Sequence, residues 1–128
     1  MEINLKIFVL SYLETASWVT CDSDENTNFT KEAMFIAENQ CIKFIQAVRA
    51  EFGDDKAKEL LDTRGKDTTY LCAHDFFLTR NSHGAGFWDK PEYYGGQENA
   101  DRLTKVAQSM GTADCIHVRG KKSKLTFA

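Results

Sequence analysis

Residues 72–89 carry a denser set of reactive side chains than any other part of the chain. His74, Asp75, Arg80, His83 and Asp89 supply the residue types used in general acid–base chemistry, and a histidine beside an arginine and an aspartate can bind and protonate a phosphate or carbonyl group. The structural alternative is that Asp75 and Asp89 pair with Arg80 and cap a turn. The chain has no nucleophile motif of the G-x-S-x-G, P-loop or H-E-x-x-H type. The sequence therefore favours a protein that is not an enzyme, while catalysis stays open as an alternative.

The same segment and the loop after it combine cations with flat rings, which suits contact with a nucleotide or with the apolar centre of a protein surface. The predicted binding residues are Arg80, Asn81, His83, Trp88, Asp89, Tyr93 and Tyr94. Within this set we expect Arg80 to serve the fold. His83 is expected to be exposed and functional, because Gly84 and Gly86 leave space around its side chain.

Two C-x-H pairs are the sharpest candidate for a metal site: Cys72 with His74, and Cys115 with His117. On neighbouring strands each pair would project to one face, and four zinc ligands could meet. A strand cysteine is also commonly a small buried hydrophobe. We predict no metal and no cofactor, with zinc as the alternative.

A β-hairpin from about residue 73 to residue 89 is predicted to position these side chains. Its first strand is an alternating aromatic run, the chain turns at Ser82-His83, and a second aromatic run ends at Asp89. Both faces of the first strand carry a phenylalanine, so we expect both faces to be covered and the polar groups to gather toward the turn.

Helical spacing predicts the other elements. One helix covers roughly the first seventeen residues, the longest runs from an N-cap at Thr30 to Gly53, a short third follows Asp54 or Asp55, and a fourth begins near Ala100 and stops at Gly111. Residues 21–27 indicate an acidic loop rather than a calcium site, because the glycine turn and the distal glutamate are missing. The tail predicts a second hairpin that turns at residues 120–121.

The predicted fold class is α+β, with three to four helices packed on one face of a small antiparallel sheet built from two hairpins. Residues 1–128 are expected to form a single domain, since this length can bury an ordinary core. The residues expected to be buried under the long helix are Phe76, Leu78, Phe87, Ile116 and Val118.

Composition is typical of a soluble globular protein, with 42% hydrophobic and 27% charged residues. The formal charge of −3 is too small to favour a DNA mimic or a nucleic-acid-coating surface. The scattered cysteines and the absence of a leader pattern predict a cytoplasmic protein with reduced thiols, and no apolar run approaches the length of a membrane span.

Residues 74–89 resemble the signature H-D-F-W-L-T-R-N-x-H-G-A-G-F-W-D of a family of small, uncharacterised proteins encoded by bacteriophages and other mobile elements. Residues 12–18 and 100–104 resemble the same family. The chain departs from the pattern at Phe77, where the family often has tryptophan, and in its basic tail. The resemblance implies a phage origin and action in the host cytoplasm, and it names no catalytic residue.

The leading hypothesis is a non-catalytic binding protein that acts on host physiology or on anti-phage defence. Its expected partner is a host or defence-system protein, or else a small signalling nucleotide, with no membrane partner and no direct nucleic-acid binding. The alternative is a small enzyme or nucleotide-binding module that uses the histidine, aspartate and arginine cluster of residues 74–89. The oligomeric state is left open.

Overall fold

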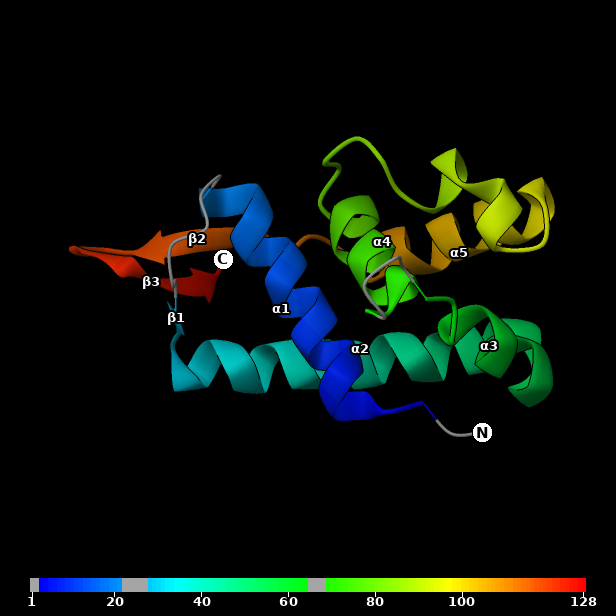
Figure 1. Ribbon diagram of the computed structural model, residues 1–128, viewed down its shortest axis with the longest axis horizontal. Coiled ribbons are helices and arrows are strands. Elements are labelled where there is room, and N and C mark those ends of the chain that lie inside the picture. The colour runs from blue at the N-terminus through cyan, green and yellow to red at the C-terminus, as the bar shows by residue number, and fades with distance from the viewer. Residues whose placement is uncertain (1–2, 22–27, 65–68) are drawn as a thin grey trace.

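The computed structural model describes residues 3–21, 28–64 and 69–128 (Figure 1). The described ranges contain five α-helices, three strands and two short 3-10 turns. In chain order these are α1 (Leu5–Cys21), β1 (Asn28–Phe29), α2 (Lys31–Phe52), α3 (Asp54–Leu61), α4 (Leu71–Arg80), η1 (Phe87–Asp89), η2 (Pro91–Tyr93), α5 (Gln97–Ser109), β2 (Cys115–Val118) and β3 (Lys121–Phe127). The acidic loop predicted at residues 21–27 falls almost wholly outside these ranges.

Helix α2 begins and ends where its capping residues predict. The Thr30 hydroxyl accepts a hydrogen bond from the Ala33 amide at 3.0 Å, and Gly53, at a φ of 82°, donates its amide to the Arg49 carbonyl at 2.9 Å. At 22 residues the helix is roughly 33 Å long. Its buried side chains are Ala33, Ala37, Cys41, Phe44, Ile45 and Val48. The predicted third and fourth helices are likewise present, as α3 at 54–61 and α5 at 97–109.

The predicted hairpin at residues 73–89 is wrong, because its first half is helix α4. Eight of the ten α4 side chains are buried, so the segment has no solvent face whose spacing could reveal a helical period. Helix α4 lies at the centre of the molecule and contacts α1, α3 and α5 (Figure 1). Phe76 stacks on Phe44 of α2 with ring centroids 4.0 Å apart. The expected burial of Phe76, Leu78 and Phe87 is therefore confirmed, on a helix and a 3-10 turn rather than on two strands.

The sheet contains one hairpin rather than two. Strands β2 and β3 pair antiparallel, with Cys115 opposite Phe127, as the tail pattern predicts. The third strand is β1, which pairs parallel with β3 and puts Phe29 opposite Leu125. Ile116 is 45% exposed and Val118 is half-buried, so the core contribution predicted for β2 is wrong for Ile116. Leu125 of β3 is the fully buried residue instead.

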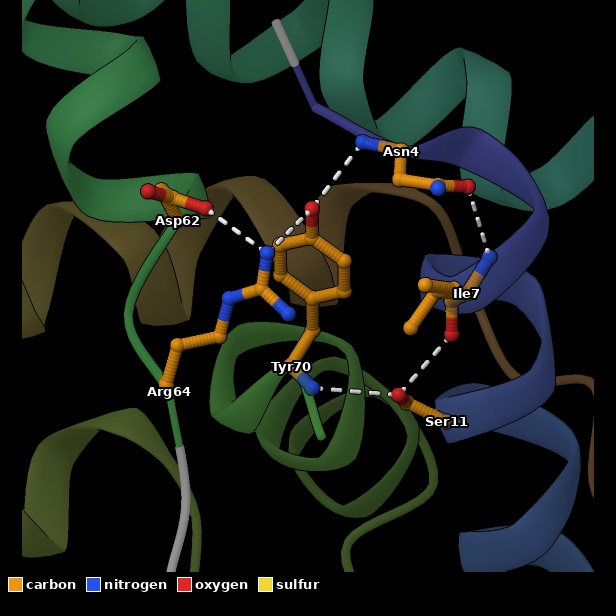
Figure 2. A network of polar contacts seen from close by, with 6 residues as sticks. All are labelled: Asn4, Ile7, Ser11, Asp62, Arg64 and Tyr70. Atoms are coloured by element: carbon orange, nitrogen blue, oxygen red, sulfur yellow. Dashed lines mark hydrogen bonds and ion pairs between the residues drawn. The ribbon is translucent and has the colours of Figure 1, made fainter. Parts of the chain in front are cut away.

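A polar network around Tyr70 ties α1 to the segment that leads into α4 (Figure 2). The Tyr70 hydroxyl accepts hydrogen bonds from the Asn4 amide and the Arg64 guanidinium, both at 2.9 Å. The Tyr70 amide donates to the Ser11 hydroxyl at 3.1 Å, and that hydroxyl donates to the Ile7 carbonyl. The first helix and the start of α4 are therefore joined by hydrogen bonds as well as by packing.

The cysteine side chains at positions 41, 72 and 115 are buried. Burial raises the pKa of the Cys41 and Cys72 thiols well above the ordinary range, because a buried thiolate would lose its hydration. A protonated and inaccessible thiol is a poor nucleophile. None of the helices in the described ranges combines the length and the apolar character needed to cross a membrane.

Candidate functional site

Arg80 is used by the fold, through contacts that differ from the predicted ones. Its side chain is 3% exposed and donates to the carbonyls of Gly111 at 2.9 Å and Met110 at 3.2 Å, with a third bond to the Tyr12 hydroxyl at 3.3 Å. These carbonyls lie just beyond α5, where the helix macrodipole leaves partial negative charge. The predicted pairing of Arg80 with Asp75 or Asp89 is wrong; Arg80 caps the end of α5.

Asp75 is a fully buried carboxylate held by two donors. Lys90 donates to one carboxylate oxygen at 2.6 Å, and the Tyr94 hydroxyl donates to the other at 2.6 Å. Burial raises the pKa of the Tyr94 hydroxyl, and the neighbouring Cys72 and Asp75 raise it further. Asp75 therefore connects α4 to Lys90 and Tyr94, which follow η1 in the chain.

The end of α4 is closed by a Schellman motif that leads into the turn. The His83 amide donates to the Leu78 carbonyl at 3.0 Å and the Ser82 amide to the Thr79 carbonyl at 3.3 Å, with Ser82 in the left-handed region at a φ of 57°. A non-glycine residue at this position is uncommon and costs free energy. The turn is therefore imposed by its surroundings.

Two buried side chains, those of Asn81 and Thr79, restrain the turn through hydrogen bonds to backbone groups. Asn81 donates to the Phe77 carbonyl at 3.1 Å and accepts from the Ala113 amide at 2.9 Å, while the Thr79 hydroxyl accepts from the Phe87 amide at 3.2 Å. A Cβ atom at Gly86 would lie 2.2 Å from the Thr79 hydroxyl, so only glycine fits there. Position 86 requires glycine because its backbone lies close to the Thr79 side chain, and not because of an unusual φ angle.

The turn itself, residues 82–85, is exposed, and two hollows are lined in part by its residues. The first hollow, of about 330 Å³, is lined by Trp18, Val19, His74, Leu78, His83 and Ala85. The second, of about 260 Å³, is lined by Leu78, Thr79, Ser82, Gly84, Trp88 and Gln108. Trp18 and Trp88, at 63% and 48% exposure, each line one hollow. Below, "turn surface" means residues 82–85 with Trp18 and Trp88.

His83 is oriented by a carboxylate and by an aromatic ring. Its Nε2 atom lies 2.9 Å from both carboxylate oxygens of Asp114, and its ring stacks on Phe77 with centroids 5.8 Å apart. Because carboxylate oxygens accept hydrogen bonds, Nε2 carries a hydrogen and donates a hydrogen bond to Asp114. The imidazole is held in one orientation although the residue is exposed.

His74 lines the first hollow from α4. Its Nδ1 atom lies 2.8 Å from the Thr15 hydroxyl, and its ring centroid lies 6.2 Å from that of Trp18. The same hydroxyl is 2.9 Å from the Ser11 carbonyl, which can only accept. Thr15 therefore donates to Ser11 and accepts from a protonated Nδ1 of His74.

The seven predicted binding residues fall into two groups. Arg80, Asn81 and Tyr94 are buried and hold the fold, whereas His83, Trp88, Asp89 and Tyr93 are exposed. Trp18, which lines the first hollow, is not among the residues predicted from the sequence. The available signal was that Trp18 falls off the apolar stripe from Leu5 to Ala16.

The premise of the zinc alternative fails on the geometry of α4. Cys72 and His74 are two positions apart on a helix, so they point to different sides, and the Cys72 side chain is fully buried. Across the described residues, no group of three or more histidine, cysteine, aspartate or glutamate side chains could hold a metal ion.

A separate groove of about 600 Å³ lies between α1 and α2. Its lining is mostly apolar and consists of Leu5, Lys6, Val9, Leu10, Leu13, Lys31, Met34, Phe35 and Glu38. Met34 of α2 is 49% exposed. Phe35, at 66% exposure, stands beside it.

Comparisons of the chain with protein-family models, with curated proteins and with solved structures find no match. The family suggested by residues 74–89 therefore stays an expectation.

Proposed function

We propose that this is a non-catalytic binding protein whose contact surface is the turn surface together with the exposed Tyr93. The observation that carries the proposal is that residues 74–89 divide into buried polar residues and exposed residues. Four polar residues of this stretch are buried and form hydrogen bonds within the fold: Asp75, Thr79, Arg80 and Asn81. Residues 82–85, 88 and 89 are exposed instead.

A held turn is a favourable contact surface because little conformational entropy is lost when it binds. The Schellman motif, the Asn81 amide and the Thr79 hydroxyl all restrain the backbone of residues 81–87. Preorganisation of this kind also gives a physical reason for a non-glycine residue at a positive φ at Ser82, since such conformations often accompany functional turns.

The exposed side chains are of the types that dominate protein interfaces. Tryptophan and tyrosine are enriched among the residues that contribute most to binding energy. Trp18 and Trp88 each line one of the two hollows beside the turn, and Tyr93 is 51% exposed. A protein partner that covered the turn would bury both indoles.

Catalysis by the predicted acid–base cluster is disfavoured, because its members do not converge. Asp75 is buried against Lys90 and Tyr94, Arg80 is buried at the end of α5, and Asp89 is exposed. His74 and His83 share a hollow, but neither Asp75 nor Arg80 lines it. The resemblance to small phage proteins supports a host or defence-system protein as the target, reached in the host cytoplasm.

The test compares the retention of one partner by the wild-type protein and by Trp88→Ala. A partner captured from a bacterial host lysate should be purified and its Kd measured for both proteins and for His83→Ala. We expect Trp88→Ala to weaken binding by about 2–4 kcal/mol while changing the free energy of unfolding by less than about 0.5 kcal/mol.

The control is Phe35→Ala, which removes an aromatic side chain that is 66% exposed, against 48% for Trp88, from the α1–α2 groove. It should bind the partner with wild-type affinity. A partner that binds Trp88→Ala and His83→Ala as tightly as the wild type would contradict the proposed contact surface.

A nucleotide ligand is the second candidate, favoured by one observation. The 330 Å³ hollow brings an exposed indole next to two imidazoles, which suits a stacked base beside a phosphate. Thermal-shift screening of nucleotides separates the two candidates. A specific stabilisation that is lost in Trp18→Ala would favour the nucleotide.

A further inference from the structure

Helix α2 has an exposed face that is separate from the turn surface. Lys31, Met34, Phe35 and Glu38 all line the α1–α2 groove from α2. Their spacing of i, i+3, i+4 and i+7 puts them on one side of the helix. Phe35 and Met34, at the centre of this face, are 66% and 49% exposed.

The two ends of this face carry opposite charges. Lys31 and Glu38 are seven residues apart, which is roughly 10 Å along a helix. Neither side chain forms an ion pair with another described residue. The midpoint between them falls between Met34 and Phe35. The face is therefore electrostatically self-complementary when it meets a copy of itself in the antiparallel direction.

We propose that a second copy of this chain covers the face, with the two α2 helices antiparallel across a two-fold axis. Lys31 then lies against the partner subunit's Glu38, and Glu38 lies against the partner subunit's Lys31. Met34 lies against the partner subunit's Phe35, and each Phe35 ring enters the apolar groove of the other copy. A two-fold interface requires this reciprocity, in which the same patch is used by both subunits.

Several features of the groove favour a second copy over an unrelated partner. The apolar lining, including Leu10 and Val9 of α1, offers space for an aromatic ring, and the face itself supplies that ring. Lys31 and Glu38 give the face one positive and one negative charge. The face therefore complements its own copy in the reversed direction better than it complements a helix with charges of a single sign. The dimer leaves the turn surface uncovered, because no residue of that surface lines the groove.

The test measures the mass of the full-length protein in solution as a function of concentration, by sedimentation equilibrium and native mass spectrometry. The wild type should dimerise. Phe35→Ala should weaken dimerisation by about tenfold or more, because it removes the central ring. K31E and E38K, each alone, should also weaken self-association about tenfold, because each brings like charges together across the two-fold axis.

The charge variants also give two rescue experiments. The double variant K31E/E38K restores opposite charges and should return to within about threefold of the wild-type dissociation constant. A mixture of the K31E chain with the E38K chain should form heterodimers, because each charge in one chain then meets its opposite in the other. A disturbance of folding would not be rescued in either way.

Trp88→Ala serves as the control and should dimerise like the wild type, which separates this inference from the proposed function. A wild-type protein that stays monomeric at all concentrations would overturn the proposal. So would charge variants that self-associate as strongly as the wild type, or a K31E and E38K mixture with no preference for heterodimers.

Discussion

Replacing Arg80 with alanine is expected to lower the free energy of unfolding by about 3–5 kcal/mol. The substitution leaves the carbonyls of Met110 and Gly111 and the hydroxyl of Tyr12 without their donor. It also opens a cavity over Phe76, whose ring lies 5.1 Å from the guanidinium carbon. A domain of this size is stable by only about 5–15 kcal/mol in total.

Denaturant unfolding with a fitted m-value measures this loss. The matched control is Arg102→Ala, because Arg102, like Arg80, donates hydrogen bonds to protein oxygens, but on the surface. Its acceptors are the carboxylate and the backbone carbonyl of Glu51. An exposed pair of this kind contributes about 0–1 kcal/mol. If Arg80→Ala cost no more than Arg102→Ala, Arg80 would not hold the end of α5.

Asp75→Asn is expected to cost about 2–4 kcal/mol, although it preserves the shape of the side chain. Both partners of Asp75 are donors, Lys90 and the Tyr94 hydroxyl. An asparagine amide can accept from one of them, but its NH₂ group must face the other, so one donor loses its bond. The Lys90 charge would also lose its counter-ion in a largely buried site.

Asp89→Asn is the control for this prediction, since Asp89 is exposed. We expect it to change stability by less than about 0.5 kcal/mol. Replacing both Asp75 and Lys90 with apolar residues should recover part of the loss, because no buried charge is then left unpaired. An Asp75→Asn variant as stable as Asp89→Asn would show that the carboxylate is not needed.

The parts of the fold predicted from the sequence are those with local signals. Thr30 and Gly53 bound α2, Gly111 follows α5, and the tail alternates around a turn at Gly120, so these elements are present close to where they were expected. Helix α4 was missed because burial on nearly every side removes the polar face that periodicity analysis needs. The parallel pairing of β1 with β3 was also missed, since a two-residue strand has no period to detect.

Whether the predicted residues bind a partner stays a prediction, but the structure separates them into buried and exposed side chains. Arginine and asparagine near a turn look like binding residues in a sequence, yet Arg80 and Asn81 are buried by α5 and the segment after it, some thirty positions away. His83 and Trp88 are exposed as a contact surface requires. Trp18 joins them only because α1 packs on α4, a tertiary contact that residue order cannot reveal.

Native-state hydrogen exchange tests most directly whether residues 74–89 build a rigid, exposed turn. The amides of His83, Phe87 and Ala113 are bonded to Leu78, Thr79 and Asn81, and each should exchange only through openings that cost several kcal/mol. The exposed amides of Gly84 and Ala85 should exchange freely and serve as the internal reference. If the amides of His83, Phe87 and Ala113 exchanged as fast as that of Gly84, the turn would be flexible in solution and could not act as a preorganised contact surface.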